Sequence, residues 1–182
     1  VTGDLTGNVT GNVTGNVTGN VTGNVTGNAD TATLASGLTG TPNITVGFST
    51  VTGFDSNALL REKCNVTAGK LSDNQTINLD NGMVHLFTTT ETTTATPNIM
   101  STAGINTSMS NGDAITVTLI TTAAAAAYCA NIQVDGAAVT ENWIGGSAPS
   151  AGGGSGVDVH TFTIIKTASE TFTVLGNQSK TS

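Results

Sequence analysis

Apolar and polar positions follow a fixed period of four over residues 1–28, where seven units keep the pattern Val-Thr-Gly-Asn with small variations. That period lies near the roughly 3.6 residues of a helical turn, but Gly costs about 1 kcal/mol relative to Ala in a helix, and Val, Thr and Asn are also poor helix formers. In an extended chain, Val and Gly face one side while Thr and Asn face the other. The pattern therefore predicts an extended ribbon with one narrow apolar side.

This ribbon cannot fold alone. Its apolar row is too thin to offset the entropy of ordering the backbone, and a lone strand leaves both backbone edges unpaired. We therefore expect other copies of the chain to complete a shaft. Its predicted core consists of Leu5, Val9, Val13, Val17, Val21 and Val25. Short repeats are typical of quasi-one-dimensional structures.

The repeat fits two other fibre types less well. Collagen requires Gly at every third position and much proline, whereas here Gly recurs every fourth and no proline precedes Pro42. Amyloid-like stacking of polar ribbons is a physical alternative, which the frequent Gly disfavours. Asn-Val-Thr triplets for N-linked sugars recur at Asn8, Asn12, Asn16, Asn20 and Asn24. Sugars so closely spaced would crowd one another, so the triplets are best explained as a by-product of the repeat.

The strict period ends at residue 28. Residues 29–63 are predicted to form a collar or linker of short strands and turns, because Thr, Gly and Val persist without regular spacing and Pro42 interrupts any ladder of hydrogen bonds. Residues 56–63 fit a short helical turn with Ser56 as its cap.

Residues 64–182 are predicted to form an all-β head, a sandwich or a jelly roll. The strand candidates are 83–90, 114–121, 127–134, 139–144, 159–166 and 171–175. The dipeptide Asp135-Gly136 predicts a tight hairpin, and the alanine run 123–127 is interpreted as a strand end with a tight connection. The predicted inward residues are Ile115, Val117, Leu119, Tyr128, Ala130, Ile132, Val134, Phe162, Ile164, Phe172 and Val174.

Composition narrows the classes of function. Charged residues make up only 9% of the chain, so hydroxyl and amide groups carry the surface polarity, which suits a component of a particle. A net charge of −7 with five Lys and Arg argues against binding nucleic acid. No apolar run is long enough for membrane insertion. The chain starts at Val1 within a repeat, so we expect a fragment of a longer polypeptide.

Two parts of the sequence resemble fibre proteins. Residues 9–16 fit the V-x-G-x-x-x-x-x pattern of the three-stranded β-helix in phage cell-puncturing needles and fibre shafts, although Val and Gly here return every four residues. The stretches VHLFTTTETTTATPNI, GDAITVTLITTAAAAAYCANIQVDG and NWIGGSAPSAGGGSGVDVHTFTIIKT are similar to the terminal domain of tail-fibre proteins of marine tailed phages, whose shafts are rich in LTGNVTGN-type repeats.

This resemblance implies a homotrimeric fibre with a three-stranded β-helix-like shaft at 1–28 and a β-sandwich or jelly-roll head at 64–182. It places the protein in an extracellular virion tail fibre. The implied partners are further copies of the chain, other virion tail components, and a glycan or protein on the host surface. A bacterial fibre or appendage unrelated to a virus is the alternative.

No catalytic, metal or cofactor site is predicted. His85 and His160 alternate with apolar residues, so we expect them in or beside the core with hydrogen-bond partners. Cys64 and Cys129 are interpreted as separate buried thiols, with a disulfide as the alternative. Polysaccharide cleavage would need two facing carboxylates. The head offers only scattered ones, Glu91, Asp113, Asp135, Glu141, Asp158 and Glu170.

Recognition fits the sequence better than catalysis. Tyr128 and Trp143 are the only Tyr and Trp, and Trp143 precedes the glycine-rich stretch 145–156, interpreted as a flexible loop. An aromatic face beside polar loop atoms is what sugar stacking needs. We therefore predict a glycan or receptor site formed by Tyr128, Trp143, Ser147, Ser150 and Ser155. The alternative for Trp143 is an anchor of the sandwich core.

Overall fold

The computed structural model describes Gly53 and residues 59–181. The chain divides into two units, Val1–Phe54 and Asp55–Ser182. The predicted shaft 1–28, with Leu5 and the five valines of its core, and most of the predicted collar 29–63 lie outside the described residues. The architecture below is that of the second unit.

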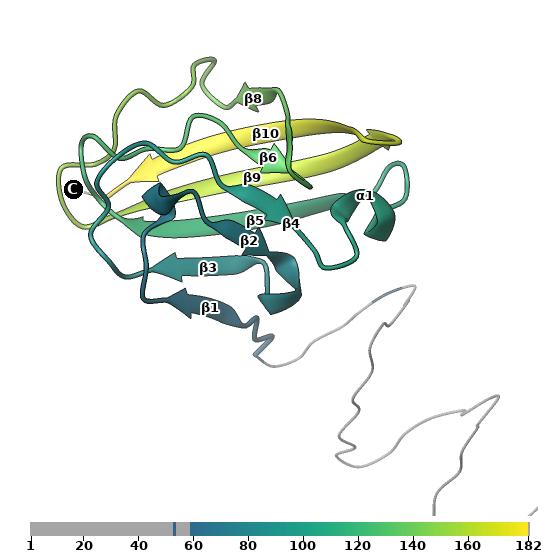
Figure 1. Ribbon diagram of the computed structural model, residues 1–182, viewed down its shortest axis with the longest axis horizontal. Coiled ribbons are helices and arrows are strands. Elements are labelled where there is room, and N and C mark those ends of the chain that lie inside the picture. Colours follow the sequence, from purple (N-terminus) through teal and green to yellow (C-terminus); the bar gives the residue numbers. More distant parts are fainter. Residues whose placement is uncertain (1–52, 54–58, 182) are drawn as a thin grey trace, which may run out of the picture. The chain divides into compact units, whose positions relative to one another are not determined.

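The described part of the chain is mostly β and forms two sheets (Figure 1). The six-stranded sheet has the order β1 (Cys64–Thr67), β3 (Val84–Phe87), β5 (Ala114–Thr122), β9 (Val157–Ala168), β10 (Thr171–Lys180) and β8 (Glu141–Trp143). The four-stranded sheet has the order β2 (Thr76–Asn78), β4 (Asn98–Met100), β6 (Gln133–Val134) and β7 (Ala137–Ala138). The connections contain the short helices η1 (Leu71–Asp73), η2 (Leu79–Asn81) and α1 (Ile105–Ser108).

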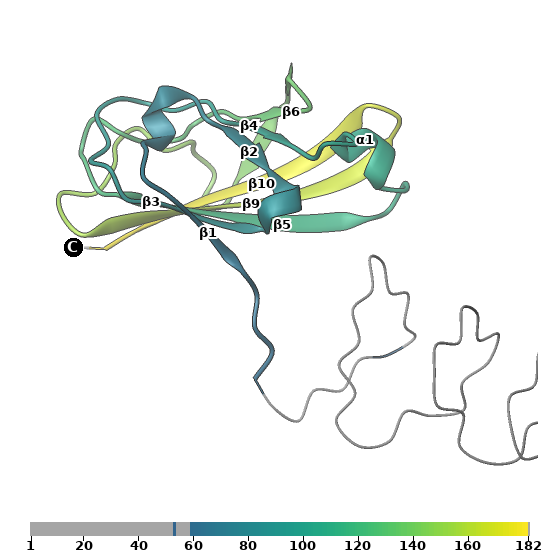
Figure 2. The ribbon, with the colours of Figure 1, turned by 60° about the horizontal axis from the view of Figure 1, so that its bottom comes forward.

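From β1 to β6 the chain passes alternately between the two sheets. β1, β3 and β5 lie side by side and parallel in one sheet, while β2, β4 and β6 do the same in the other. Parallel neighbours need a crossover connection, and here each crossover includes a strand of the opposite sheet. Figure 2 shows the resulting two layers. This parallel winding differs from the antiparallel Greek keys of the predicted jelly-roll alternative.

The long strands of the six-stranded sheet are antiparallel. β9 pairs with β5 on one side and with β10 on the other, and β10 then pairs in parallel with the short edge strand β8. Side chains on these strands alternate between the two faces of the sheet, so every second residue points toward the four-stranded sheet. Val117, Leu119, Phe162, Ile164 and Val174 are all fully buried there, as their spacing predicts. Ile115 and Phe172 pack at the border of the same core.

The alternation prediction fails over residues 127–132. Only Gln133–Val134 of the predicted strand 127–134 is a strand, and Cys129 makes an isolated bridge to Ala95. Cys129 and Ile132 are buried whereas Tyr128 and Ala130 are only half-buried, so the inward phase shifts by one residue between them. The shift falls at residues 130 and 131, which belong to no strand and so need not alternate. Before it, the alanine run ends in a tight turn closed by the Ala127 N–H on the Ala124 carbonyl at 2.8 Å. That turn confirms the predicted connection.

Of the other local predictions, one is confirmed and one is wrong. Asp135 and Gly136 join β6 to β7 with φ angles of 51° and 81°, which confirms the hairpin. Residues 59–63 form no helix, contrary to the predicted turn at 56–63. Leu59 and Leu60 are 87% and 73% exposed, and such a short segment without packing cannot hold a helix. Four short strands, β1, β2, β4 and β7, lie outside the predicted strand ranges.

Candidate functional site

A groove lies at the β8 edge of the six-stranded sheet, and three of the five predicted recognition residues line it. Its volume is about 250 Å³. Trp143 comes from β8, Ser147 and Ser150 come from the following loop, and Asn177, Gln178 and Lys180 come from β10. The structure therefore brings an aromatic ring, hydroxyls, amides and an ammonium group together.

Gly176 positions the ring of Trp143. The two residues are directly opposite each other in the β8–β10 pairing. A Cβ at position 176 would lie 2.9 Å from Cζ3 of the indole, so only a glycine leaves room for the ring on that face of the sheet. The ring then meets Phe162 edge to face, with a centroid distance of 5.9 Å and an interplanar angle of 76°.

The surroundings of Trp143 are consequently compatible with both interpretations that the sequence left open. One part of the indole packs against the core through Phe162, and the remainder of this half-buried side chain lines the groove. An aromatic surface that is held in one orientation loses little entropy when a sugar stacks on it. The packing therefore makes the ring better suited to recognition.

The loop after Trp143 is also held in place. The Ile144 N–H donates to the Gly176 carbonyl at 2.9 Å, and the Gly146 N–H donates to the Trp143 carbonyl at 3.0 Å. Gly145 and Gly146 adopt φ angles of 92° and 85°, a region that favours glycine. The start of the loop is thus a defined turn, which differs from the flexible loop predicted for 145–156.

Two predicted recognition residues lie elsewhere. Tyr128 lines a small pocket of about 10 Å³ together with Glu91 and His160. Ser155 is exposed but does not line the groove. The groove is instead lined by Asn177, Gln178 and Lys180, which the sequence did not predict as site residues. The alternation of β10 could have placed Gln178 and Lys180 on one face, but no sequence signal pairs that strand with β8.

A second and larger groove, of about 670 Å³, lies between the β6–β7 hairpin, the α1 region and the β9–β10 turn. Its wall is rich in small side chains, and its charged groups are Asp135 and Glu170. Both oxygens of Asp135 are occupied, because they accept the Ile105 and Asn106 N–H groups at 2.9 and 2.8 Å. The smaller groove has the more favourable combination of groups for sugar recognition, since aromatic, amide and cationic groups meet there.

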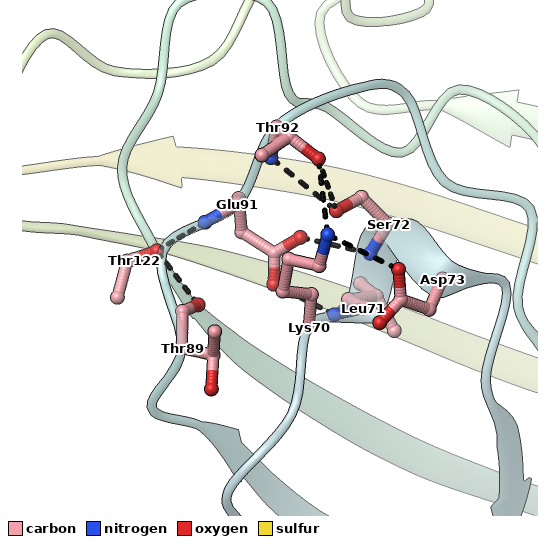
Figure 3. A network of polar contacts seen from close by, with 8 residues as sticks. All are labelled: Lys70, Leu71, Ser72, Asp73, Thr89, Glu91, Thr92 and Thr122. Carbon is pink, nitrogen blue, oxygen red and sulfur yellow. Dashed lines mark hydrogen bonds and ion pairs between the residues drawn. The ribbon is translucent and has the colours of Figure 1, made fainter.

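The carboxylates of the head mostly hold the backbone. Of the six considered for polysaccharide cleavage, five accept a backbone N–H: Glu91, Asp113, Asp135, Glu141 and Asp158. Figure 3 shows the clearest case, in which buried Glu91 accepts the Leu71 and Ser72 N–H groups at 2.7 and 2.8 Å at the start of η1. The Glu91 N–H in turn donates to Thr122 at 2.8 Å. These carboxylates fix loops to neighbouring strands.

The two histidines are both buried, as expected. His85 Nε2 donates to the Gly82 carbonyl at 2.9 Å, and its Nδ1 accepts from the Asn65 amide at 3.2 Å. Burial lowers the pKa of His85, partly offset by the bond to Gly82. Burial also lowers the pKa of His160 to about 4, with the nearby charge of Asp158 acting in the opposite direction. His160 Nδ1 has no hydrogen-bond partner among the described residues, so its predicted partner is not observed.

The cysteines are separate thiols. Cys64 is exposed, contrary to expectation, and Cys129 is buried. Burial, and then the charge of Glu141, raises the pKa of the Cys129 thiol to about 12.

Within residues 59–181, no cluster of three potential metal ligands is found. The described helices include none that is long and apolar enough to cross a membrane. Comparison with family models, curated proteins and solved structures gives no match.

Proposed function

We propose that the chain is the shaft and head of a homotrimeric tail fibre of a tailed phage, and that the head attaches the virion to a host-surface glycan through the Trp143 groove. The fibre acts outside the host cell and joins other virion tail components. The observation that carries the proposal is that one chain combines a repeat that other copies must complete with a head whose groove has sugar-binding chemistry.

The groove supports a saccharide as ligand. A sugar ring has apolar C–H faces that stack on an indole, and its hydroxyls pair with amide and hydroxyl groups. Asn177, Gln178, Ser147 and Ser150 supply those polar groups, and Lys180 adds a positive charge. A glycan with carboxylate or phosphate substituents therefore fits better than a positively charged one.

Three copies matter for attachment strength. A shallow groove of about 250 Å³ covers only a small ligand and binds it weakly. Three such grooves on one rigid support raise the overall avidity by about 100-fold or more when the spacing of the glycans fits. Weak single sites on a trimeric fibre are therefore sufficient for adhesion.

The proposal assigns the head no enzymatic role and no cofactor. Release of new reducing ends from a surface polysaccharide would contradict this part and would favour a depolymerase. Electron micrographs of the source, with the protein labelled by antibody, distinguish a phage tail from a cellular appendage.

Binding to an array of bacterial surface glycans tests the groove. Ser147→Trp fills the groove next to Trp143, while Ser155→Trp makes the same change on the glycine-rich stretch outside it. We expect Ser147→Trp to weaken binding at least about tenfold, because the ligand loses its stacking surface, and Ser155→Trp to leave binding unchanged. Equal binding by both variants would contradict the groove assignment.

A further inference from the structure

The outer face of the six-stranded sheet carries no charge. We use this name for the face that points away from the four-stranded sheet. The charged residues within its strands, Glu141, Asp158, Lys166 and Lys180, all fall at positions that alternate onto the other face. The outward positions are occupied by aliphatic residues, threonine, and a few other uncharged side chains. Such a surface is unusual for a chain with a net charge of −7.

An apolar row crosses four strands of this face, near the end of β5 and the start of β9. The register places Val66 beside Leu86, Leu86 beside Ile120, and Ile120 beside Val159. The next row contains Thr118 beside Thr161. Val66, Val157 and Leu175 on this face are 62%, 36% and 38% exposed, and they account for half of the large exposed hydrophobic residues in the described part. Figure 2 shows that no described element covers this side of the sheet.

We propose that the outer face packs against the same face of other copies of this chain, around the axis of the fibre. The inference rests on the assembly of copies put forward above and names the surface through which the heads meet. Two copies carry the same charge of −7 and repel each other wherever their charged surfaces approach. A face without charge lets identical chains meet without this repulsion, and the outer face also exposes Val66, Val157 and Leu175.

Other partners fit this face less well. A partner with opposite charge would gain nothing from a face that has no charge to pair with. Sheets pack face to face when the side chains of their facing surfaces interdigitate, and the uncharged aliphatic and threonine side chains of the outer face can do so. The opening repeat independently requires other copies, and copies joined there bring their heads together at high effective concentration.

Protection of single cysteines in the full chain tests the inference. In a Cys64→Ser background, Thr116→Cys places a thiol on the outer face, at a position that is exposed in a single copy. Thr94→Cys places one at an exposed position outside the sheet, as a matched control. Labelling with a maleimide polymer is measured together with the mass by light scattering. If copies cover the face, labelling at 116 is at least about tenfold slower than at 94, because a thiol reacts only when the reagent reaches it.

A charged substitution then tests whether contact between uncharged outer faces causes the slow labelling at residue 116. Adding Thr161→Asp to the Thr116→Cys chain places one charge per copy on the face, and we expect labelling at 116 to rise to the rate at 94. Thr94→Asp in the Thr116→Cys chain is the matched control and keeps residue 116 protected.

The outcomes separate this inference from the fibre proposal. A trimer with residue 116 protected supports both. A trimer that labels equally at 116 and 94 overturns the outer-face contact and leaves the fibre standing. A monomer with residue 116 reactive overturns both, and a monomer with residue 116 protected means that another part of the same chain covers the face.

Discussion

The two faces of the six-stranded sheet reverse the usual distribution of polarity. The inner face is closed by the second sheet, yet it holds Asp158, His160 and Lys166, all nearly inaccessible to solvent. The outer face is open in a single copy, yet it has no charged residue. Charge is normally placed on the open face, because burying it costs free energy unless it finds partners.

The difference follows from what the inner charges do. Asp158 accepts the Gly153 N–H at 2.7 Å, and Lys166 donates to the Met109 carbonyl at 2.8 Å and to the Asn106 carbonyl. They hold the loops that close the ends of the sandwich. Charged side chains thus serve the inner face and are absent from the outer one. The stability of one copy depends on the inner face, and the proposed association of copies depends on the outer face.

Neighbouring isoleucines on β9 test this division most strongly. Ile164 is fully buried on the inner face, and Ile165 lies on the outer face. Ile164→Ala should lower the free energy of unfolding by about 4 kcal/mol through lost burial and a cavity. Ile165→Ala should cost about 1 kcal/mol in a single copy, since its side chain is less buried there. Urea unfolding of the two variants measures the difference.

The dependence of these two losses of stability on protein concentration is a further test of the two faces. If the outer face is covered by other copies, the effect of Ile165→Ala grows at concentrations where the chain assembles, while the effect of Ile164→Ala stays the same. Equal losses in dilute protein would show that the two faces contribute alike to the stability of one copy.

The next expected effect is a loss of stability in acid that arises on the inner face. Unfolded His160 takes up a proton near its ordinary pKa of 6.5, whereas the folded protein holds that pKa at about 4 because the ring is buried. Between these values the unfolded state binds more protons, so stability is complete above 6.5 and falls as pH decreases toward 4. The full loss amounts to roughly 3 kcal/mol, from about 1.4 kcal/mol per pKa unit.

His160→Gln removes this titrating group and should flatten the slope of unfolding free energy between about pH 7 and pH 5, above the range in which ordinary carboxylates titrate. Thr161→Gln, one residue along on the outer face, should keep the slope. His85 retains its own smaller contribution of the same sign, since its pKa is also lowered by burial. An unchanged slope in His160→Gln would mean that the ring is already solvated in the folded protein.

Sequence periodicity located the long strands but not their neighbours. In β5, in the middle of β9 and in the first half of β10, inward aliphatic and aromatic residues at every second position outweigh any other local preference, so these segments are predictable. The second half of β10 has Gly176, Gln178 and Lys180 at its inward positions, so the predicted strand 171–175 covers only its first half. β1, β2 and β4 have three or four residues each and few apolar side chains, which is too little for a periodic signal. The parallel winding depends on contacts between distant segments and leaves no local trace.

Only some residues of the candidate groove could be predicted from the sequence. Ser147 and Ser150 could be predicted as groove residues because they follow Trp143 closely in a serine- and glycine-rich loop. Asn177, Gln178 and Lys180 reach the groove only because Gly176 lies opposite Trp143 in the β8–β10 register. The position of Tyr128 could not be predicted, because residues 130 and 131 belong to no strand and the alternation that places Ile132 inward does not extend back to residue 128.

The smallest expected effect concerns the threonines of the outer face. Thr116 and Thr163 lie opposite each other on β5 and β9, with 3.2 Å between their hydroxyl oxygens. Replacing both with Val keeps their shape and the preference for a strand, so unfolding of a dilute single copy should change by less than about 0.5 kcal/mol. The double variant also removes the hydroxyls that keep an uncovered, uncharged face wetted. We therefore expect it to associate at lower protein concentration than the parent chain, as measured by light scattering over a dilution series. A double variant that associates no more readily would mean that the outer face does not take part in contacts between copies.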